Sequence, residues 1–307
     1  MTDNLKAMAS VPGGSPRQAS SPRAAPRKGV TKGRGRRQRR RLTVYVGGAL
    51  AIGALVTAFP FLWMLAASVK PQSESLQYPP TLLPQQVTFE YLGRLFTELN
   101  FMRYLINTIS VVCISMFGLL FMSMAGYAFA KFKFRGQRFL FFLVLATMMI
   151  PVQVTMIPTY LILNGLNLTN TLVGIALPTL VSGFNIFLFR QFMTTVPTEL
   201  LEAARLDGAS EWRTFWQIVI PISKPILAVQ VVLTFITGWN SFLWPLIIAS
   251  DQNLYTLSVG LALLNQQVAT NPSLQMAGAS LMVVPVMIVF IVFQRYVIQG
   301  FALSGLK

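Results

Sequence analysis

Long apolar stretches alternate with short polar segments over most of this sequence. A helix needs about 20 mostly apolar residues to cross a hydrocarbon core of roughly 30 Å. The sequence predicts six such helices, and none of their ranges contains Asp or Glu. The ranges are 42–68, 104–130, 138–163, 169–193, 225–249 and 277–299. The pattern therefore predicts an all-α, multi-pass membrane protein, with its transmembrane domain in residues 42–307.

Prolines interrupt several of the apolar stretches. Each one removes a backbone N–H donor and favours a kink, which neighbouring polar groups can tolerate inside a membrane protein. The predicted kinks lie at Pro151, Pro158, Pro178, Pro245 and Pro285.

The first 41 residues form a polar, basic tail that holds 12 of the 25 Lys and Arg. Such a segment has too few apolar side chains to fold, so we expect disorder. The apolar stretch after it is longer than the core of a cleaved signal peptide, about 7–15 residues. The arginines can bind nucleic acid, bind anionic lipid or hold the N-terminus inside. They have no aromatic residues between them and adjoin a membrane helix, so we expect topology anchoring with lipid contact and no nucleic-acid partner.

The distribution of positive charge predicts the orientation of the chain. With the N-terminus in the cytoplasm, the cytoplasmic segments hold 22 of the 25 Lys and Arg, and only Lys70, Arg94 and Arg103 lie outside. Cytoplasmic segments of membrane proteins are enriched in these residues. We therefore expect both termini, and the connection 194–224, on the cytoplasmic side of a bacterial inner membrane.

Several kinds of chemistry have no support in the sequence. It contains no His and a single cysteine, Cys113, so we expect no internal disulfide, metal site or cofactor. No phosphate-binding Walker motif occurs, so ATP hydrolysis is expected on a partner subunit. The predicted spans also lack acidic residues, which counts against an ion-gradient-driven secondary transporter or channel, although backbone carbonyls can still coordinate sodium. No catalytic constellation indicates an enzyme.

The connection 194–224 contains a polar helix between two apolar stretches. Pro197 suits its first turn, and Gly208 can adopt the left-handed conformation that ends a helix. Ser210 can cap a second helix that ends near Pro221. The connection therefore predicts two short helices joined by a sharp corner.

Leu200, Ala203, Ala204 and Asp207 recur at i, i+3, i+4 and i+7 in the first of these helices. They form a face of mostly small side chains that lets a partner approach closely. The alternative is an amphipathic helix on the membrane surface, which Trp212 and Trp216 favour for the second helix.

The run from Glu202 to Ala209, followed by Ile218-Val219-Ile220-Pro221, resembles the EAA loop of permease subunits in bacterial ATP-binding-cassette importers. In that loop glutamate, two alanines, aspartate and glycine precede Ile-x-Leu-Pro at fixed spacing, and Ile220 stands where leucine is usual. Further segments are similar to the carbohydrate-uptake branch, above all to the smaller permease of maltose-type and glycerol-3-phosphate-type importers. They are 146–151 with 156–158, 189–192, 239–246 and 254–257.

The resemblance implies a permease that translocates a sugar or related polyol into the cell. It also implies a heterodimer with a second permease subunit, two ATP-binding-cassette ATPase subunits below the pair, and an extracytoplasmic solute-binding protein. In the family the EAA helix seats in a groove on the ATPase. The positions implied to couple the two subunits are Glu202, Ala203, Ala204, Asp207 and Gly208.

Five polar or aromatic side chains in the predicted spans are candidates to line a translocation pathway: Asn107, Gln153, Asn185, Trp239 and Asn240. Amides can bind hydroxyl groups, and aromatic rings can pack against the faces of sugars. The alternative is hydrogen bonding between helices, a common use of Asn and Gln in membranes.

Overall fold

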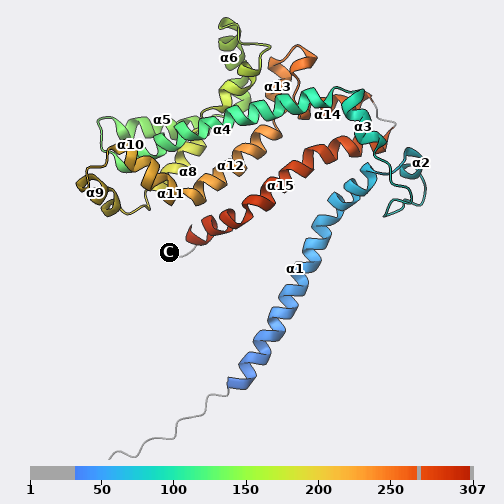
Figure 1. Ribbon diagram of the computed structural model, residues 1–307, viewed down its shortest axis with the longest axis horizontal. Coiled ribbons are helices and arrows are strands. Elements are labelled where there is room, and N and C mark those ends of the chain that lie inside the picture. The colour runs from blue at the N-terminus through green and yellow to red at the C-terminus, as the bar shows by residue number, and fades with distance from the viewer. Residues whose placement is uncertain (1–31, 268–270, 305–307) are drawn as a thin grey trace, which may run out of the picture. The chain divides into compact units, whose positions relative to one another are not determined.

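The computed structural model of the protein describes residues 32–267 and 271–304, and all regular elements in these ranges are helices (Figure 1). The chain divides into two units, residues 1–56 and 57–307. The first 31 residues of the predicted disordered tail lie outside the described residues. The helix α1 (Lys32–Ser68) begins before the predicted boundary at residue 42. Arginine is a good helix former, so the helix of the first span extends back into the basic segment.

The first unit contains the N-terminal part of α1. Its described side chains, from residue 43 to residue 56, are all exposed. The stretch Thr43–Ser68 is long and apolar enough to cross a membrane. An exposed apolar helix of this length is suited to lipid.

The helix α4 (Phe101–Lys131) forms the centre of the second unit. It packs along α8 (Gly183–Met193) and α12 (Lys224–Trp239), and α15 (Pro272–Ser304) packs against α12 (Figure 1). Small residues allow α4 and α8 to approach closely: a Cβ atom on Gly126 would lie 2.4 Å from the Cβ of Phe189.

Three candidate spans of the second unit are bent. The helices α5 (Gln137–Met149) and α6 (Val152–Gly165) meet at 105°, where Pro151 removes a backbone donor. The prediction treats residues 138–163 as one span, and the structure divides it there. A second bend, of 41°, separates α7 (Leu172–Ala176) and the 3-10 turn η1 (Leu177–Thr179) from α8. A third bend, of 78°, precedes α12. The elements before it are α10 (Glu211–Thr214), the π-helical turn η2 (Phe215–Val219) and α11 (Ile220–Ile222).

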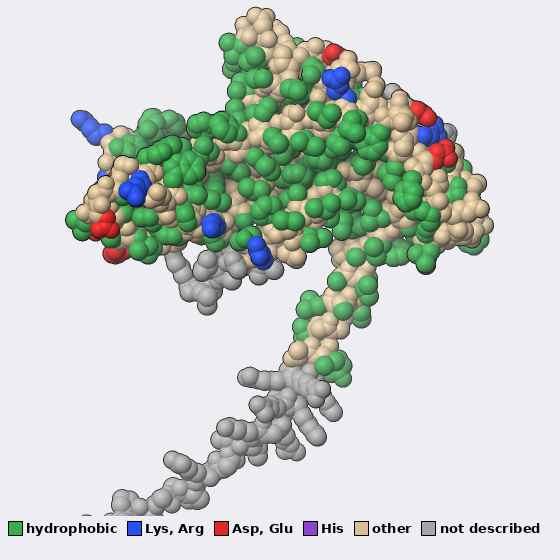
Figure 2. Space-filling view, viewed as in Figure 1, with side chains coloured by type: hydrophobic (Ala, Val, Ile, Leu, Met, Phe, Trp, Pro, Cys, Tyr) green, Lys and Arg blue, Asp and Glu red, His purple; other side chains and the backbone are tan. Residues whose placement is uncertain are grey.

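The number of membrane crossings depends on how these bent pairs are counted. Among the described residues, three helices are long and apolar enough to cross alone, and up to six spans result if each bent pair is one span. On the face in Figure 2, hydrophobic side chains cover the middle of the second unit and charged ones lie mostly toward its ends. The six predicted spans are compatible with this arrangement and stay a prediction.

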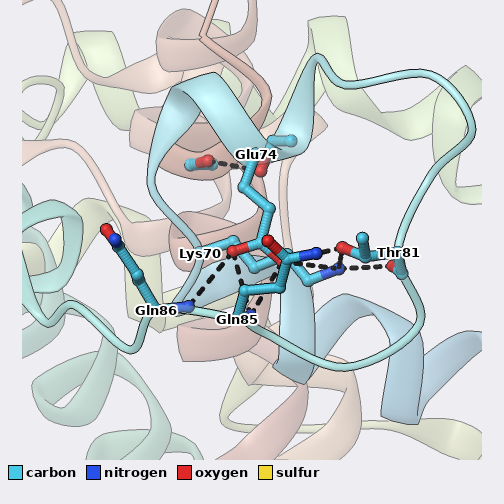
Figure 3. Close-up of polar contacts among 7 residues, drawn as sticks. Lys70, Glu74, Thr81, Gln85 and Gln86 are labelled. Atoms are coloured by element: carbon cyan, nitrogen blue, oxygen red, sulfur yellow. Dashed lines mark hydrogen bonds and ion pairs between the residues drawn. The ribbon is translucent and has the colours of Figure 1, made fainter.

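The segment between α1 and α3 (Glu90–Thr97), which includes α2 (Gln72–Ser75), folds around a buried ion pair. The Lys70 ammonium lies 3.8 Å from Glu74 Oε1 and donates to the carbonyl and hydroxyl oxygens of Thr81. The Glu74 carboxylate also accepts from the Thr81 hydroxyl and from the backbone N–H groups of Gln85 and Gln86 (Figure 3). These contacts fix a long connection that has little regular structure.

Shorter helices complete the second unit. The helix α9 (Thr198–Leu206) lies in the connection between α8 and α10. The helix α13 (Leu243–Ile248), the 3-10 turn η3 (Gln252–Leu254) and α14 (Leu257–Gln267) follow α12. Figure 1 places α9 and α3 near opposite ends of α4.

Candidate coupling segment

The helix α9 carries three of the predicted coupling residues, Glu202, Ala203 and Ala204, and the other two, Asp207 and Gly208, follow its last residue. Pro197 precedes its first turn, and Gly208 follows it with a φ of 78°. The Ala209 N–H donates to the Ala204 carbonyl at 2.9 Å, and the Gly208 N–H donates to the Arg205 carbonyl at 3.0 Å. These are the two hydrogen bonds of a Schellman C-cap, which needs a left-handed residue at the position of Gly208.

Further polar contacts close the corner between α9 and α10. The Ser210 hydroxyl accepts from the Arg213 N–H at 3.2 Å and caps α10. Across the corner, Arg205 Nε donates to Glu211 Oε1 at 2.7 Å. The hydrogen bond to Glu211 raises the pKa of Arg205 above its ordinary value, so the guanidinium keeps its charge at any physiological pH.

The two faces of α9 have different surroundings. Leu201 and Ala204 are buried, and Leu201 lies in a core cluster with the π-helical turn η2. Glu202, Ala203 and Leu206 are exposed. This exposed face combines a carboxylate, a small residue and an apolar residue, which suits a protein partner in water.

The structure divides the small-residue face that the spacing predicts. Leu200, Ala203 and Asp207 are exposed, but Ala204 packs into the core of its own unit. The side chain that the sequence argument missed is Leu206, which is 89% exposed. Its signal is a leucine between two charged residues, Arg205 and Asp207.

The second helix of the corner exposes aromatic side chains. Trp212 and Trp216 are 59% and 39% exposed, and their rings meet edge to face with centroids 5.7 Å apart. Exposed tryptophans are typical of the interface between membrane and water. The two tryptophans therefore favour the membrane-surface interpretation for α10 and η2, which stays a prediction.

Two predicted pathway residues are tied to other elements by hydrogen bonds. Asn107 is buried, and its Nδ2 donates to the carbonyls of Asn253 at 2.7 Å and Tyr255 at 3.0 Å. Trp239 is also buried, and its Nε1 donates to the Met282 carbonyl at 3.0 Å. Both contacts fit the alternative of hydrogen bonding between helices.

The other three predicted pathway residues are more accessible. Asn185 is half-buried. Its backbone carbonyl accepts from Gln230 Nε2 at 2.9 Å, and its side-chain Nδ2 donates to the Thr234 hydroxyl at 3.4 Å. Gln153 and Asn240 are exposed. A pathway role for any of the five stays a prediction. Within the described part of the chain, no group of three or more His, Cys, Asp or Glu side chains is placed to hold a metal ion.

Comparison with known proteins identifies the family of this chain. Residues 118–302 match the family described as binding-protein-dependent transport system inner membrane component. The chain belongs to this family. The matched range covers the coupling segment and most of the helices of the second unit.

Curated relatives cover most of this permease. It is 36% identical to the arabinooligosaccharides transport system permease protein AraQ of Halalkalibacterium halodurans, over 83% of this chain and 92% of the relative. It is 34% identical to the sn-glycerol-3-phosphate transport system permease protein UgpE of Yersinia pestis, over 85% of this chain and 96% of the relative.

Solved structures share the fold of the permease. One chain comes from the crystal structure of a bacterial ABC transporter involved in the import of the acidic polysaccharide alginate. It matches with a TM-score of 0.74 and 27% identity, over 85% of this chain and 98% of that chain. A second alginate transporter, solved with a periplasmic protein bound to alginate pentasaccharide, matches with a TM-score of 0.59 and 16% identity, over 83% and 93% of the two chains, and supports the fold alone.

These matches confirm the resemblance and the all-α membrane fold that the sequence predicts. The chain is a permease subunit of an ATP-binding-cassette importer and a multi-pass component of the inner membrane. It works in a transport system that depends on a binding protein. The alternative of an ion-gradient-driven secondary transporter or channel is therefore set aside.

Proposed function

We propose that this permease imports a carbohydrate or related polyol, driven by an ATPase that docks on α9. The observation that carries the docking proposal is the exposed surface of Glu202, Ala203 and Leu206 beside a corner closed by the chain's own bonds. Asp207 and Gly208 continue this surface, and Ala204 supports it from the core side. A short, fixed helix outside the apolar spans is suited to transmit movement between a membrane domain and a soluble partner.

The partners of the complex are a second, different permease, two ATP-binding-cassette ATPases and an extracytoplasmic solute-binding protein. The family description supports the binding protein. The single chain leaves a broad apolar surface on α5 and α6, with side chains such as Phe139, Phe142 and Met149 exposed. Surfaces of this kind suit lipid and a second membrane subunit.

Both termini and α9 face the cytoplasm in this proposal. The end of α4 nearer to α9 is followed by a connection with Lys133 and Arg135 and by Arg138 at the start of α5, whereas residues 250–276 contain no Lys or Arg. This asymmetry supports the orientation.

The solute is expected to be rich in hydroxyl groups. The curated relatives are named for arabinooligosaccharides and sn-glycerol-3-phosphate, and the more similar structure is described for alginate. Among the candidate pathway residues, Gln153 and Asn240 are the most accessible, and an amide can both donate to and accept from hydroxyls.

Uptake by vesicles that contain the whole complex tests the proposal. Labelled neutral oligosaccharides, polyol phosphates and acidic oligosaccharides are supplied with the solute-binding protein. We expect uptake of one class to require ATP on the cytoplasmic side and to continue when a protonophore is added. Uptake that collapses with the protonophore while ATP is present contradicts an ATP-driven mechanism, and uptake of none of the three classes contradicts the proposed solute.

A further inference from the structure

Two side chains on one face of α4 contact residues just before and just after α9. Tyr127 and Lys131 lie four residues apart near the end of α4, so their side chains share a face. The Lys131 ammonium donates to the carbonyl of Val196, just before α9 begins. The Tyr127 hydroxyl lies 3.5 Å from Glu211 Oε2, just after the corner that follows α9.

Glu211 connects the two helices through its two carboxylate oxygens. Oε1 accepts from Arg205 in the last turn of α9, and Oε2 faces Tyr127 on α4. Tyr127 is 5% exposed, and its ring centroid lies 5.6 Å from that of Phe215 in the π-helical turn. A buried ring with a single polar atom has little freedom to move, so the position of Glu211 is tied to that of α4.

The opposite end of α4 holds an outer loop in a similar way. Asn107 donates to the carbonyls of Asn253 and Tyr255, and the buried Thr108 hydroxyl accepts from the Leu257 N–H at 2.8 Å. These contacts join two side chains of α4 to the backbone of residues 253–257. A movement of α4 therefore moves this loop.

The helix between these two groups of contacts is unbroken and contains no proline. Tyr127 follows Asn107 by 20 residues, which is about 30 Å along a helix and close to the thickness of the hydrocarbon core. Every other candidate span that the structure describes in the second unit contains a proline or is bent. Of these candidate spans, α4 is therefore the one that connects its two ends through an unbroken helix without proline.

We infer that Tyr127, Lys131 and Glu211 are positioning residues that make α4 a rigid connection between α9 and the outer loop 253–257. A displacement of α9 is carried along α4 to the opposite face of the membrane domain, instead of being absorbed at the corner. This inference rests on the proposed function and adds the route by which the ATPase and the solute-binding protein affect each other.

The test uses the complete reconstituted complex. Lys131→Met and Tyr127→Phe each remove one hydrogen-bonding group, and Glu211→Gln removes the negative charge that strengthens the bond from Arg205. All three keep the approximate size of the side chain. Matched controls make the same changes outside these contacts: Lys133→Met, Tyr160→Phe and Glu90→Gln. Two quantities are measured, namely co-purification of the ATPase and the ratio of ATP hydrolysis with and without the loaded binding protein.

We expect the ATPase to co-purify with all variants as it does with the parent. The stimulation ratio should fall several-fold in the single variants and approach one in the double variant Lys131→Met/Tyr127→Phe. Lys131→Arg should keep the parent ratio, because a guanidinium can also donate to the Val196 carbonyl. The controls should behave like the parent.

A variant at the far end of α4 separates transmission from local structure. Asn107→Ala removes the bonds to the outer loop and should lower the same ratio, although Asn107 lies about 30 Å along α4 from Tyr127. Ser110→Ala is its control, because the Ser110 hydroxyl donates to the Ile106 carbonyl of the same helix at 2.8 Å.

The inference is overturned if the double variant and Asn107→Ala keep the parent ratio. It is also overturned if the variants lose the ATPase while the complexes that remain are stimulated normally, since the contacts then serve only local structure. Glu211→Gln lies on a side chain that is 45% exposed, so it tests the contact without disturbing a core. A parent complex that neither binds the ATPase nor responds to the binding protein counts against the proposed function instead.

Discussion

Lys70 and Glu74, four residues apart in the sequence, form a buried ion pair in which Nζ and Oε1 are separated by 3.8 Å. Their side chains are only 4% and 6% exposed. The Thr81 oxygens complete the surroundings of the ammonium, and two backbone N–H groups complete those of the carboxylate. Removing one partner of such a pair leaves an uncompensated buried charge. The connection from residue 70 to residue 86 therefore depends on both side chains.

Glu74→Gln should loosen this connection. The glutamine keeps the shape of the side chain, but it leaves the Lys70 ammonium without a counter-charge and turns an N–H₂ group toward N–H donors. We expect a lower Tm of the purified protein and faster protease cleavage between residues 76 and 89. Glu90→Gln, at an exposed carboxylate in the same region, is the control and should change neither.

The same pair predicts how stability depends on pH. The Thr81 hydroxyl, followed by the N–H groups of Gln85 and Gln86 and the Lys70 charge, holds the pKa of Glu74 below its ordinary value of 4.5. The carboxylate therefore stabilises the fold fully above the unfolded-state pKa, and this contribution is lost as pH falls through the folded-state pKa. The difference in Tm between the parent and Glu74→Gln should be constant near neutral pH and shrink in acid. A difference that persists in strong acid contradicts this origin.

Gly208 should tolerate asparagine better than valine. A Cβ atom at this position meets no atom of this chain within 4 Å, so within the chain a substitution acts through the left-handed backbone alone. Valine should cost roughly 1–2 kcal/mol in that conformation, whereas asparagine adopts it more readily. Stimulated ATP hydrolysis in the complex should follow the order glycine, asparagine, valine. Gly165→Val is the matched control, because its surroundings are equally open and its φ is not positive.

Leu206 should contribute to docking but not to the fold of the chain. Burying an exposed leucine in an interface yields about 1.5–3 kcal/mol, so Leu206→Ser should weaken binding of the ATPase by roughly tenfold or more. Titration of the ATPase against the purified permease measures this effect, and the Tm should stay the same. Leu83→Ser changes a leucine that is 77% exposed in the loop between α2 and α3, and binding should be unaffected. Equal affinity for both variants removes Leu206 from the docking surface.

Gly126→Ala should separate α4 from α8. The added Cβ would lie 2.4 Å from Phe189 Cβ and 3.0 Å from the Arg190 backbone nitrogen. Because one neighbour is backbone, the helices must shift, at a cost of roughly 1–3 kcal/mol. We expect a clear fall in Tm in detergent. Gly93→Ala, with open space around it, should leave Tm unchanged or slightly raised.

The ends of α9 could be predicted from the sequence because their causes are local. Pro197, Gly208 and Ser210 each act on backbone groups within a few residues. The structure places Gly208 and Ser210 in the predicted roles, whereas Pro197 lies at the N-cap, just before the first turn for which it is predicted. The face that α9 exposes could not be predicted in the same way. Helical spacing groups Ala203 with Ala204, but the packing of distant helices decides which alanine is buried.

Contacts between distant segments account for the other differences. Pro151 predicts the loss of a backbone donor, but the 105° bend also reflects where α6 packs, with Leu163 buried beside Ile175 in a core cluster. The partners of Asn107 lie 146 and 148 residues away in the chain. No local pattern distinguishes such an amide from one that lines a pathway.

The closed corner at Gly208 has a consequence for the thermodynamics of assembly. A loop that becomes ordered only on binding loses conformational entropy, and this loss reduces its affinity. Here the Schellman cap and the Arg205–Glu211 pair restrict the corner before any partner arrives. Little conformational entropy of the corner then remains to be lost when the ATPase binds, so a helix as short as α9 can bind it tightly through a small surface. Each transport cycle would begin from the same narrow set of conformations.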